Sequence, residues 1–104
     1  MIDFEKIEGL DWDAGNARKS EAKHGVSQNE AEQVFFYAPL LVAADPMHSE
    51  TEPRLHALGR TNLGRLLNIS FTLRFGGRKV RVISGRAMHR KERIVYEENA
   101  QTNP

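Results

Sequence analysis

The stretch ISGRAMHRKERIVYEE, residues 83–98, gathers basic side chains where a predicted strand gives way to a predicted helix. Four of them crowd this junction: Arg86, His89, Arg90 and Lys91. The start of a helix already carries partial positive charge, so each exposed cation there costs about 0.3–1 kcal/mol, and Glu92 offsets only part of that cost. A bound anion would make the same amides and cations favourable together. The junction therefore predicts a phosphate-binding position.

Cleavage of RNA is a reaction that such residues could carry out without a metal ion. RNA supplies its own nucleophile in the 2′-OH, so the protein needs to add a base, an acid and cations around the phosphorane. The helix start would hold the His89 ring neutral and able to accept a proton. The sequence has no Walker or nucleophile-elbow motif, and HSE at 48–50 offers at most two metal ligands. We therefore expect no metal ion and no cofactor.

The charge of the chain is divided unevenly between its halves. Residues 1–52 hold 4 Lys and Arg against 11 Asp and Glu, whereas residues 53–104 hold 11 against 3. The net charge of +1 thus hides a change from −7 to +8. Acidic helices packed near basic strands would give this division, and so would a cationic face for a polyanion. Composition leaves both interpretations open.

A chain of 104 residues without cysteine is long enough for one domain with its own core. The lack of thiols removes disulfides and thiolate metal sites and fits a reducing compartment. The start, MIDFEKIEGL, has no signal-peptide pattern, and the longest apolar run, APLLVAA, is far shorter than a membrane span. We expect one cytoplasmic domain over residues 1–104, with an N-terminal extension at 1–9 and a frayed tail at 99–104.

The pattern of apolar and turn-forming residues predicts the order of the elements. DWDAGNARKSEAKHG is typical of a first helix, and a capping box from Ser27 to Glu30 opens a second, which ends before Pro39. Four β-like runs follow, joined by short turn-rich segments: LLVAAD, RLHALGR, RLLNISFTL and KVRVIS. The expected fold is α+β, with two N-terminal helices on one face of a four-stranded antiparallel sheet and then a C-terminal helix.

Alternation within these runs separates a core face from a polar face. The core side of the third run holds Leu67, Ile69, Phe71 and Leu73. If the registers align, the other face collects His56, Arg60, Asn68, Ser70, Thr72, Lys79 and Arg81. The solvated side of an antiparallel sheet would have a similar composition. Alternation thus predicts where an RNA site would lie without distinguishing it from a wet surface.

Several short motifs occur together in one order along the chain. They are WD followed by KHGVS, then HSE…R…GR, then GRLLNISFT, and finally ISGR-M-RKER. In this order they resemble the BrnT family of type II toxins, which are small ribonucleases with a RelE-like fold. The resemblance extends from Trp12 to about Glu98. It implies a toxin that cleaves RNA and inhibits translation.

The resemblance also implies the partners and the catalytic residues. A BrnA-type ribbon-helix-helix antitoxin would neutralise the toxin, form a heterotetramer with it and bind operator DNA. In the family, the functional residues are a loop glutamate and arginines of the sheet and its last turn. Carried onto this sequence they are Glu52, Arg60, Arg81 and Arg86, with Glu50 as the alternative glutamate.

The chemistry of individual side chains suggests further site residues, independently of the family resemblance. His89 is the candidate base, although relatives with Thr or Ser before RKER form a capping box, so His89 could instead be a poorer N-cap. The expected RNA-binding residues are His56, Lys79, Arg90 and Lys91. Because cations that bind phosphate do not by themselves prove turnover, a non-catalytic nucleic-acid-binding or degenerate toxin subunit of the same fold is the alternative function.

Overall fold

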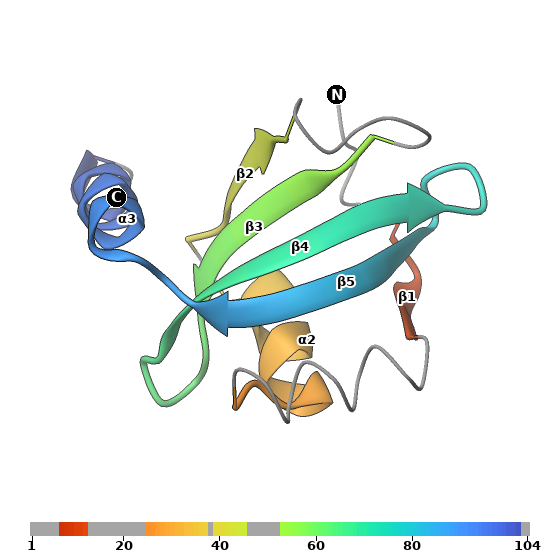
Figure 1. The fold of residues 1–104 in the computed structure, drawn as a ribbon, viewed down its shortest axis with the longest axis horizontal. Coiled ribbons are helices and arrows are strands. Elements are labelled where there is room, and N and C mark those ends of the chain that lie inside the picture. Colours follow the sequence, from red (N-terminus) through yellow and green to blue (C-terminus); the bar gives the residue numbers. More distant parts are fainter. Residues whose placement is uncertain (1–6, 13–24, 38, 46–52, 103–104) are drawn as a thin grey trace.

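The computed structural model describes residues 7–12, 25–37, 39–45 and 53–102, which form a five-stranded sheet and two helices (Figure 1). The strands are β1 (Gly9–Trp12), β2 (Leu41–Ala44), β3 (Leu55–Arg60), β4 (Leu66–Arg74) and β5 (Lys79–Ala87). The helices are α2 (Gln28–Phe36) and α3 (Arg90–Thr102). Across the sheet the strand order is β1-β5-β4-β3-β2. No helix in the described part of the chain is long and apolar enough to cross a membrane.

The four strands predicted from the sequence are confirmed as β2 to β5, each antiparallel to the next. The prediction of a four-stranded, wholly antiparallel sheet is wrong, because β1 adds a fifth strand parallel to β5. Its sequence, GLDW, is too short to show an alternating pattern, and its hydrogen bonds depend on β5. The predicted first helix falls on residues 13–24, outside the described residues, so the described part holds two helices rather than three.

The predicted start of α2 is confirmed as a capping box. Ser27 Oγ accepts the backbone N–H of Glu30 at 3.1 Å, and Glu30 Oε1 accepts the N–H of Ser27 at 3.1 Å. The other carboxylate oxygen of Glu30 accepts Arg65 Nη1 at 2.9 Å. Burial acts to raise the pKa of Glu30, but these hydrogen bonds outweigh it and lower the pKa below its usual value. The cap therefore ties α2 to the segment that leads into β4.

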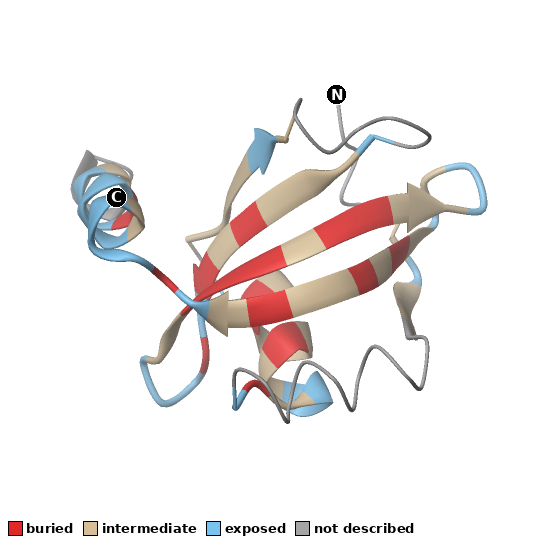
Figure 2. Ribbon diagram, in the orientation of Figure 1, coloured by how far each residue is buried: buried red, intermediate tan, exposed pale blue. Residues whose placement is uncertain are grey.

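The core lies between α2 and one face of the sheet. Val34 of α2 is fully buried. A Cβ added at Gly59 would lie 2.7 Å from Val34 Cγ1, so only glycine at this position lets the helix approach β3 this closely. The Phe35 ring meets Phe71 edge to face at 5.2 Å between centroids. The other buried members of this core are Val26, Ala31, Ala57, Leu67, Ile69, Val80 and Val82. Figure 2 shows buried positions separated by less buried ones along β3 and β5, whereas β4 has longer buried stretches because Asn68 and Thr72 on its other face are buried as well.

A β-bulge at Ile83 changes the face to which the later residues of β5 point. The register shifts there, opposite Ser70 and Phe71 of β4. Because side chains alternate along a strand, Arg81 and Arg86 would point to opposite faces of a regular β5. The bulge instead places both on the polar face of the sheet, away from α2.

α3 follows β5 directly and lies beyond its end, on the other side of the sheet from α2 (Figure 1). Two buried residues hold it there. Met88 is buried in the connection, and Tyr96 donates its hydroxyl to the Pro39 carbonyl at 2.6 Å. Burial raises the pKa of Tyr96, although the charge of Arg60 acts to lower it. The helix continues to Thr102, beyond residue 99, where the sequence predicts a frayed tail.

Candidate active site between α3 and the polar face

Glu92 is the centre of the hydrogen bonds at the start of α3. Arg86 donates to both of its carboxylate oxygens, at 2.7 and 3.0 Å. The backbone N–H of His89 and the side-chain amide of Asn68 donate to it at 2.8 Å each. The Arg86 hydrogen bonds, aided by those from His89 and Asn68 and opposed by burial, lower the pKa of Glu92 to about 2. One ionised carboxylate thus neutralises the nearest cation and caps the helix.

The bidentate pair fixes the direction of the Arg86 guanidinium. Its Nη1 also donates to the Ala87 carbonyl at 3.1 Å. Among the described residues, Nε–H and the second N–H of Nη2 have no acceptor. A guanidinium held by its two outer nitrogens keeps a rigid orientation, so these donors are positioned before any ligand arrives.

His56 lies next to this cluster on β3 and connects it to the edge of the sheet. Its Nε2 is 2.8 Å from Asp45 Oδ2, and its Nδ1 is 3.1 Å from both Asn68 Oδ1 and Ser70 Oγ. Because the Asn68 amide nitrogen must face the carboxylate at Glu92, its oxygen must face His56. Both ring nitrogens of His56 therefore meet an acceptor, an arrangement that suits an imidazole with a proton on each nitrogen.

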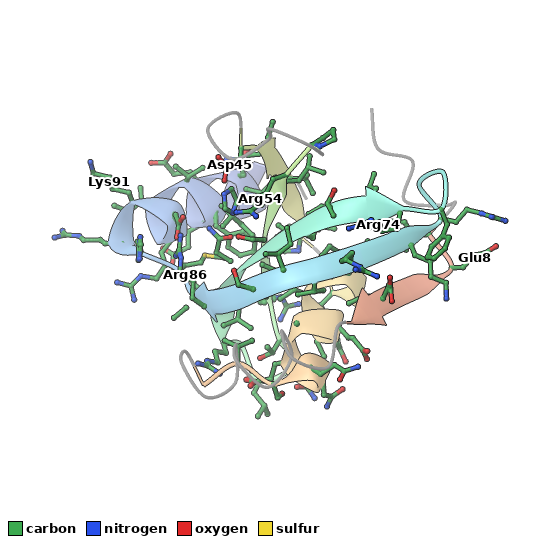
Figure 3. All side chains as sticks on the ribbon, turned by 45° about the vertical axis from the view of Figure 1, so that its right-hand side comes forward. Glu8, Asp45, Arg54, Arg74, Arg86 and Lys91 are labelled. Carbon is green, nitrogen blue, oxygen red and sulfur yellow. The ribbon has the colours of Figure 1, made fainter. Side chains whose placement is uncertain are left out.

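A pocket of about 280 Å³ opens between α3 and the polar face. Its walls come from β2, β3, β4 and α3, and they combine apolar and polar groups: Ala43, His56, Leu58, Asn68, Lys91, Glu92 and Val95. In Figure 3, Arg86 and Lys91 lie by the start of α3, and Asp45 and Arg54 lie where β2 ends and β3 begins. The described residues include no group of three or more His, Cys, Asp or Glu that could hold a metal ion.

The structure divides the predicted site residues into two groups. Arg86, His56 and Lys91 come together around the pocket. Arg81 lies five positions before Arg86 on β5, about 16 Å away along an extended strand. It donates to Asp11 at 2.6 and 3.1 Å and so ties β1 to the sheet.

The other predicted site residues lie away from the pocket, at its rim, or outside the residues that the structure describes. Lys79, at the start of β5, is opposite Arg74 at the far end of the sheet from the pocket. Arg60, His89 and Arg90 are exposed, and His89 meets Glu92 through its backbone rather than its ring. Glu52 and the alternative Glu50 lie outside the described residues.

Sequence reasoning missed three residues that organise this site. Glu92 was expected only to offset part of the local charge, yet its position three residues after His89 is the capping-box spacing and was the available signal. Asn68 was placed on the polar face by alternation but given no role. Asp45 gave no signal, because its contact with His56 depends on the pairing of β2 with β3.

Replacing Glu92 with glutamine should destabilise the protein by about 2–3 kcal/mol near neutral pH. Folding lowers the pKa of Glu92 from 4.5 to about 2, so the stabilisation is complete above 4.5 and disappears as the pH falls toward 2. Urea unfolding of both proteins should show a difference near pH 7 that shrinks toward pH 3. Glu97→Gln, at an exposed position of the same helix, is the control and should change stability little at either pH. A difference that does not depend on pH would contradict this account.

The chain resembles known proteins in its sequence family and in its fold. The family model described as "Ribonuclease toxin, BrnT, of type II toxin-antitoxin system" matches residues 12–92. No curated protein sequence matches the chain. Among solved structures, the chain is similar to the crystal structure of the Brucella abortus ribonuclease toxin BrnT, with a TM-score of 0.56 and 23% identity. That match covers 79% of this chain and 97% of the other, and it shows a common fold. The chain belongs to the BrnT family of ribonuclease toxins of type II toxin–antitoxin systems.

Proposed function

We propose that this protein cleaves RNA internally without a metal ion and thereby inhibits translation in the cytoplasm. One observation carries the proposal: Arg86 is held rigidly by Glu92 beside a pocket that His56 and Lys91 line, and two of its N–H groups have no acceptor in the part of the chain that the structure describes. Preorganised cations of this kind stabilise charge as it develops on a phosphorane and need little reorganisation during the reaction.

In the proposed reaction, the 2′-oxygen of RNA attacks the adjacent phosphorus and the bond to the 5′-oxygen breaks. The products are a 2′,3′-cyclic phosphate and a 5′-hydroxyl. The unoccupied N–H groups of Arg86 donate to the non-bridging oxygens, and Lys91 adds a second positive charge. His56 gives a proton to the departing 5′-oxygen. At rest the Nδ1 proton is engaged by Asn68 and Ser70, and it is the one that is transferred, because these contacts are longer than the contact of Nε2 with Asp45.

The group that removes the 2′ proton is either His89 or Glu52. His89 is exposed at the start of α3, close in the chain to Arg86, and its ring makes no hydrogen bond among the described residues. Glu52 immediately precedes Pro53, whose carbonyl accepts the Thr72 hydroxyl on the polar face at 2.8 Å. Arg60 and Arg90 contribute positive charge at the rim and Lys79 contributes it at the far end of the sheet, whereas the charge of Arg81 is paired with Asp11.

Membership of a toxin–antitoxin family supports the proposed partners. We assign a BrnA-type ribbon-helix-helix antitoxin that neutralises the toxin in a heterotetramer and connects it to operator DNA. Because the second half of the chain carries the cations, an acidic antitoxin segment would find complementary charge on the face that RNA uses.

Purified protein should cleave single-stranded RNA in the presence of EDTA and leave 2′,3′-cyclic phosphate ends. Binding should weaken steeply with salt, because phosphate contacts release counterions. The same RNA with 2′-deoxy nucleotides is the control and should bind without being cut. Activity that EDTA abolishes and a divalent ion restores would contradict metal independence, and salt-sensitive binding of RNA without any cleavage would favour the non-catalytic alternative.

A further inference from the structure

We propose that the pocket between α3 and the polar face binds one RNA base next to the scissile phosphate, and that it favours guanine over adenine. The inference rests on the proposed ribonuclease function and adds a base-specific subsite to it. The site is bounded by Ala43, Leu58 and Val95 as apolar walls and by His56, Asn68, Lys91 and Glu92 as polar groups.

The size and position of the pocket favour a base as its occupant. A volume of about 280 Å³ lies near the lower end of small-ligand sites, so it suits a single ring system rather than a helix or strand of a partner. Apolar side chains from β2, β3 and α3 would cover the faces of such a ring. Glu92 lines the pocket and also holds Arg86. A base bound in the pocket would therefore bring its own phosphate to the guanidinium.

The hydrogen-bonding capacity of the polar wall determines which base fits. Glu92 already accepts four N–H groups, and the Asn68 oxygen and both nitrogens of His56 are engaged. The groups that remain for a ligand are donors: the ammonium of Lys91 and the second amide N–H of Asn68. Guanine presents two adjacent acceptors, O6 and N7, whereas adenine places an amino donor beside N7. The pocket should therefore accept guanine and reject adenine.

The test fills the pocket from α3 and uses a neighbouring residue as the control. Val95 lines the pocket and is 48% exposed, whereas Ile94 is 46% exposed on the same helix and does not line it. The probes are short 2′-deoxy oligonucleotides with guanine, adenine or an abasic site at one position, measured by fluorescence anisotropy with the full chain. Wild-type protein and Ile94→Trp should bind the guanine oligonucleotide about tenfold more tightly than the other two. Val95→Trp should bind all three alike, with the affinity of the abasic one.

Each outcome has a separate meaning for the subsite and for the enzyme. Equal binding of the three oligonucleotides by the wild type overturns the subsite, as does equal discrimination by Val95→Trp and Ile94→Trp. Loss of antitoxin binding in Val95→Trp with unchanged base discrimination also overturns it and assigns the pocket to the protein partner. Because these probes cannot be cleaved, guanine preference without any turnover on RNA would reject the ribonuclease proposal and retain a base-binding pocket.

Discussion

Replacing Arg86 with alanine should lower the rate constant for RNA cleavage by roughly 10²–10³-fold. The guanidinium is held by Glu92 with two of its N–H groups left without an acceptor among the described residues, and removing it takes away a charge donor already in position. Lysine at this position should recover little activity, because a single ammonium cannot form the bidentate pair and also reach a phosphate oxygen. Single-turnover cleavage of a defined RNA measures the effect apart from product release.

Two comparisons separate the loss of catalysis from a loss of stability. Arg86→Ala leaves the Glu92 carboxylate without its strongest partner, so the variant is best compared with Glu92→Gln and with the double variant. Arg65 provides the matched arginine control, because it forms a similar pair with Glu30, at 2.9 Å, on the α2 side of the sheet. Arg65→Ala should lower stability and leave cleavage unchanged. Equal activities of Arg86→Ala and Arg65→Ala at temperatures where both are folded would remove Arg86 from the site.

The second large effect concerns His56. Its replacement by glutamine should lower the cleavage rate by roughly 10²–10⁴-fold, because the 5′-oxygen then departs without receiving a proton. An RNA whose scissile 5′-oxygen is replaced by sulfur tests this role directly, since a thiolate departs without protonation. His56→Gln should cleave that substrate at nearly the wild-type rate.

His89→Gln is the matched histidine variant, and it distinguishes the two imidazoles. If His89 removes the 2′ proton, this variant should be slow on both substrates, because sulfur at the leaving position does not help the attacking oxygen. If His89 only caps α3 through its backbone N–H, the variant should cleave both at the wild-type rate. A His56→Gln protein that is equally slow on the sulfur substrate would show that His56 is not the proton donor.

Local patterns in the sequence were sufficient where neighbouring residues decide the structure. The capping box at Ser27 and the alternation around Ile69 each depend on contacts within a few residues. The strands β2 to β5 and the start of α2 could therefore be predicted. The residues that share the polar face could also be predicted, because antiparallel pairing of successive strands determines which side chains lie on the same face.

Contacts between distant parts of the chain could not be predicted in this way. β1 is a strand only because β5 pairs with it, and Arg81 is committed to Asp11, seventy positions away. The pocket requires α3 to lie over β2 and β3, a placement that the Tyr96 hydroxyl and the Pro39 carbonyl secure. Sequence patterns placed the basic residues near Arg86 together, and the spacing of Glu92 from His89 is that of a capping box. The pairing of Glu92 with Arg86 and Asn68 depends on the three-dimensional arrangement.

The bulge at Ile83 divides β5 into two parts, or phases, in which opposite sequence positions face the core. This division limits how the sequence of β5 can change. Upstream of Ile83 the even-numbered positions belong to the core, and downstream the odd-numbered ones do. Loss of Ile83 itself would leave a regular strand in which Arg81 and Arg86 still share the polar face. One residue added after the bulge would instead invert the second phase, turning Arg86 toward the interior and Gly85 outward. The interior has no space for that exchange, since even a Cβ at Gly85 would lie 2.8 Å from Ile69 Cδ1. The strand can therefore lose its bulge residue and keep both faces, whereas an added residue would cost the core and the phosphate site together.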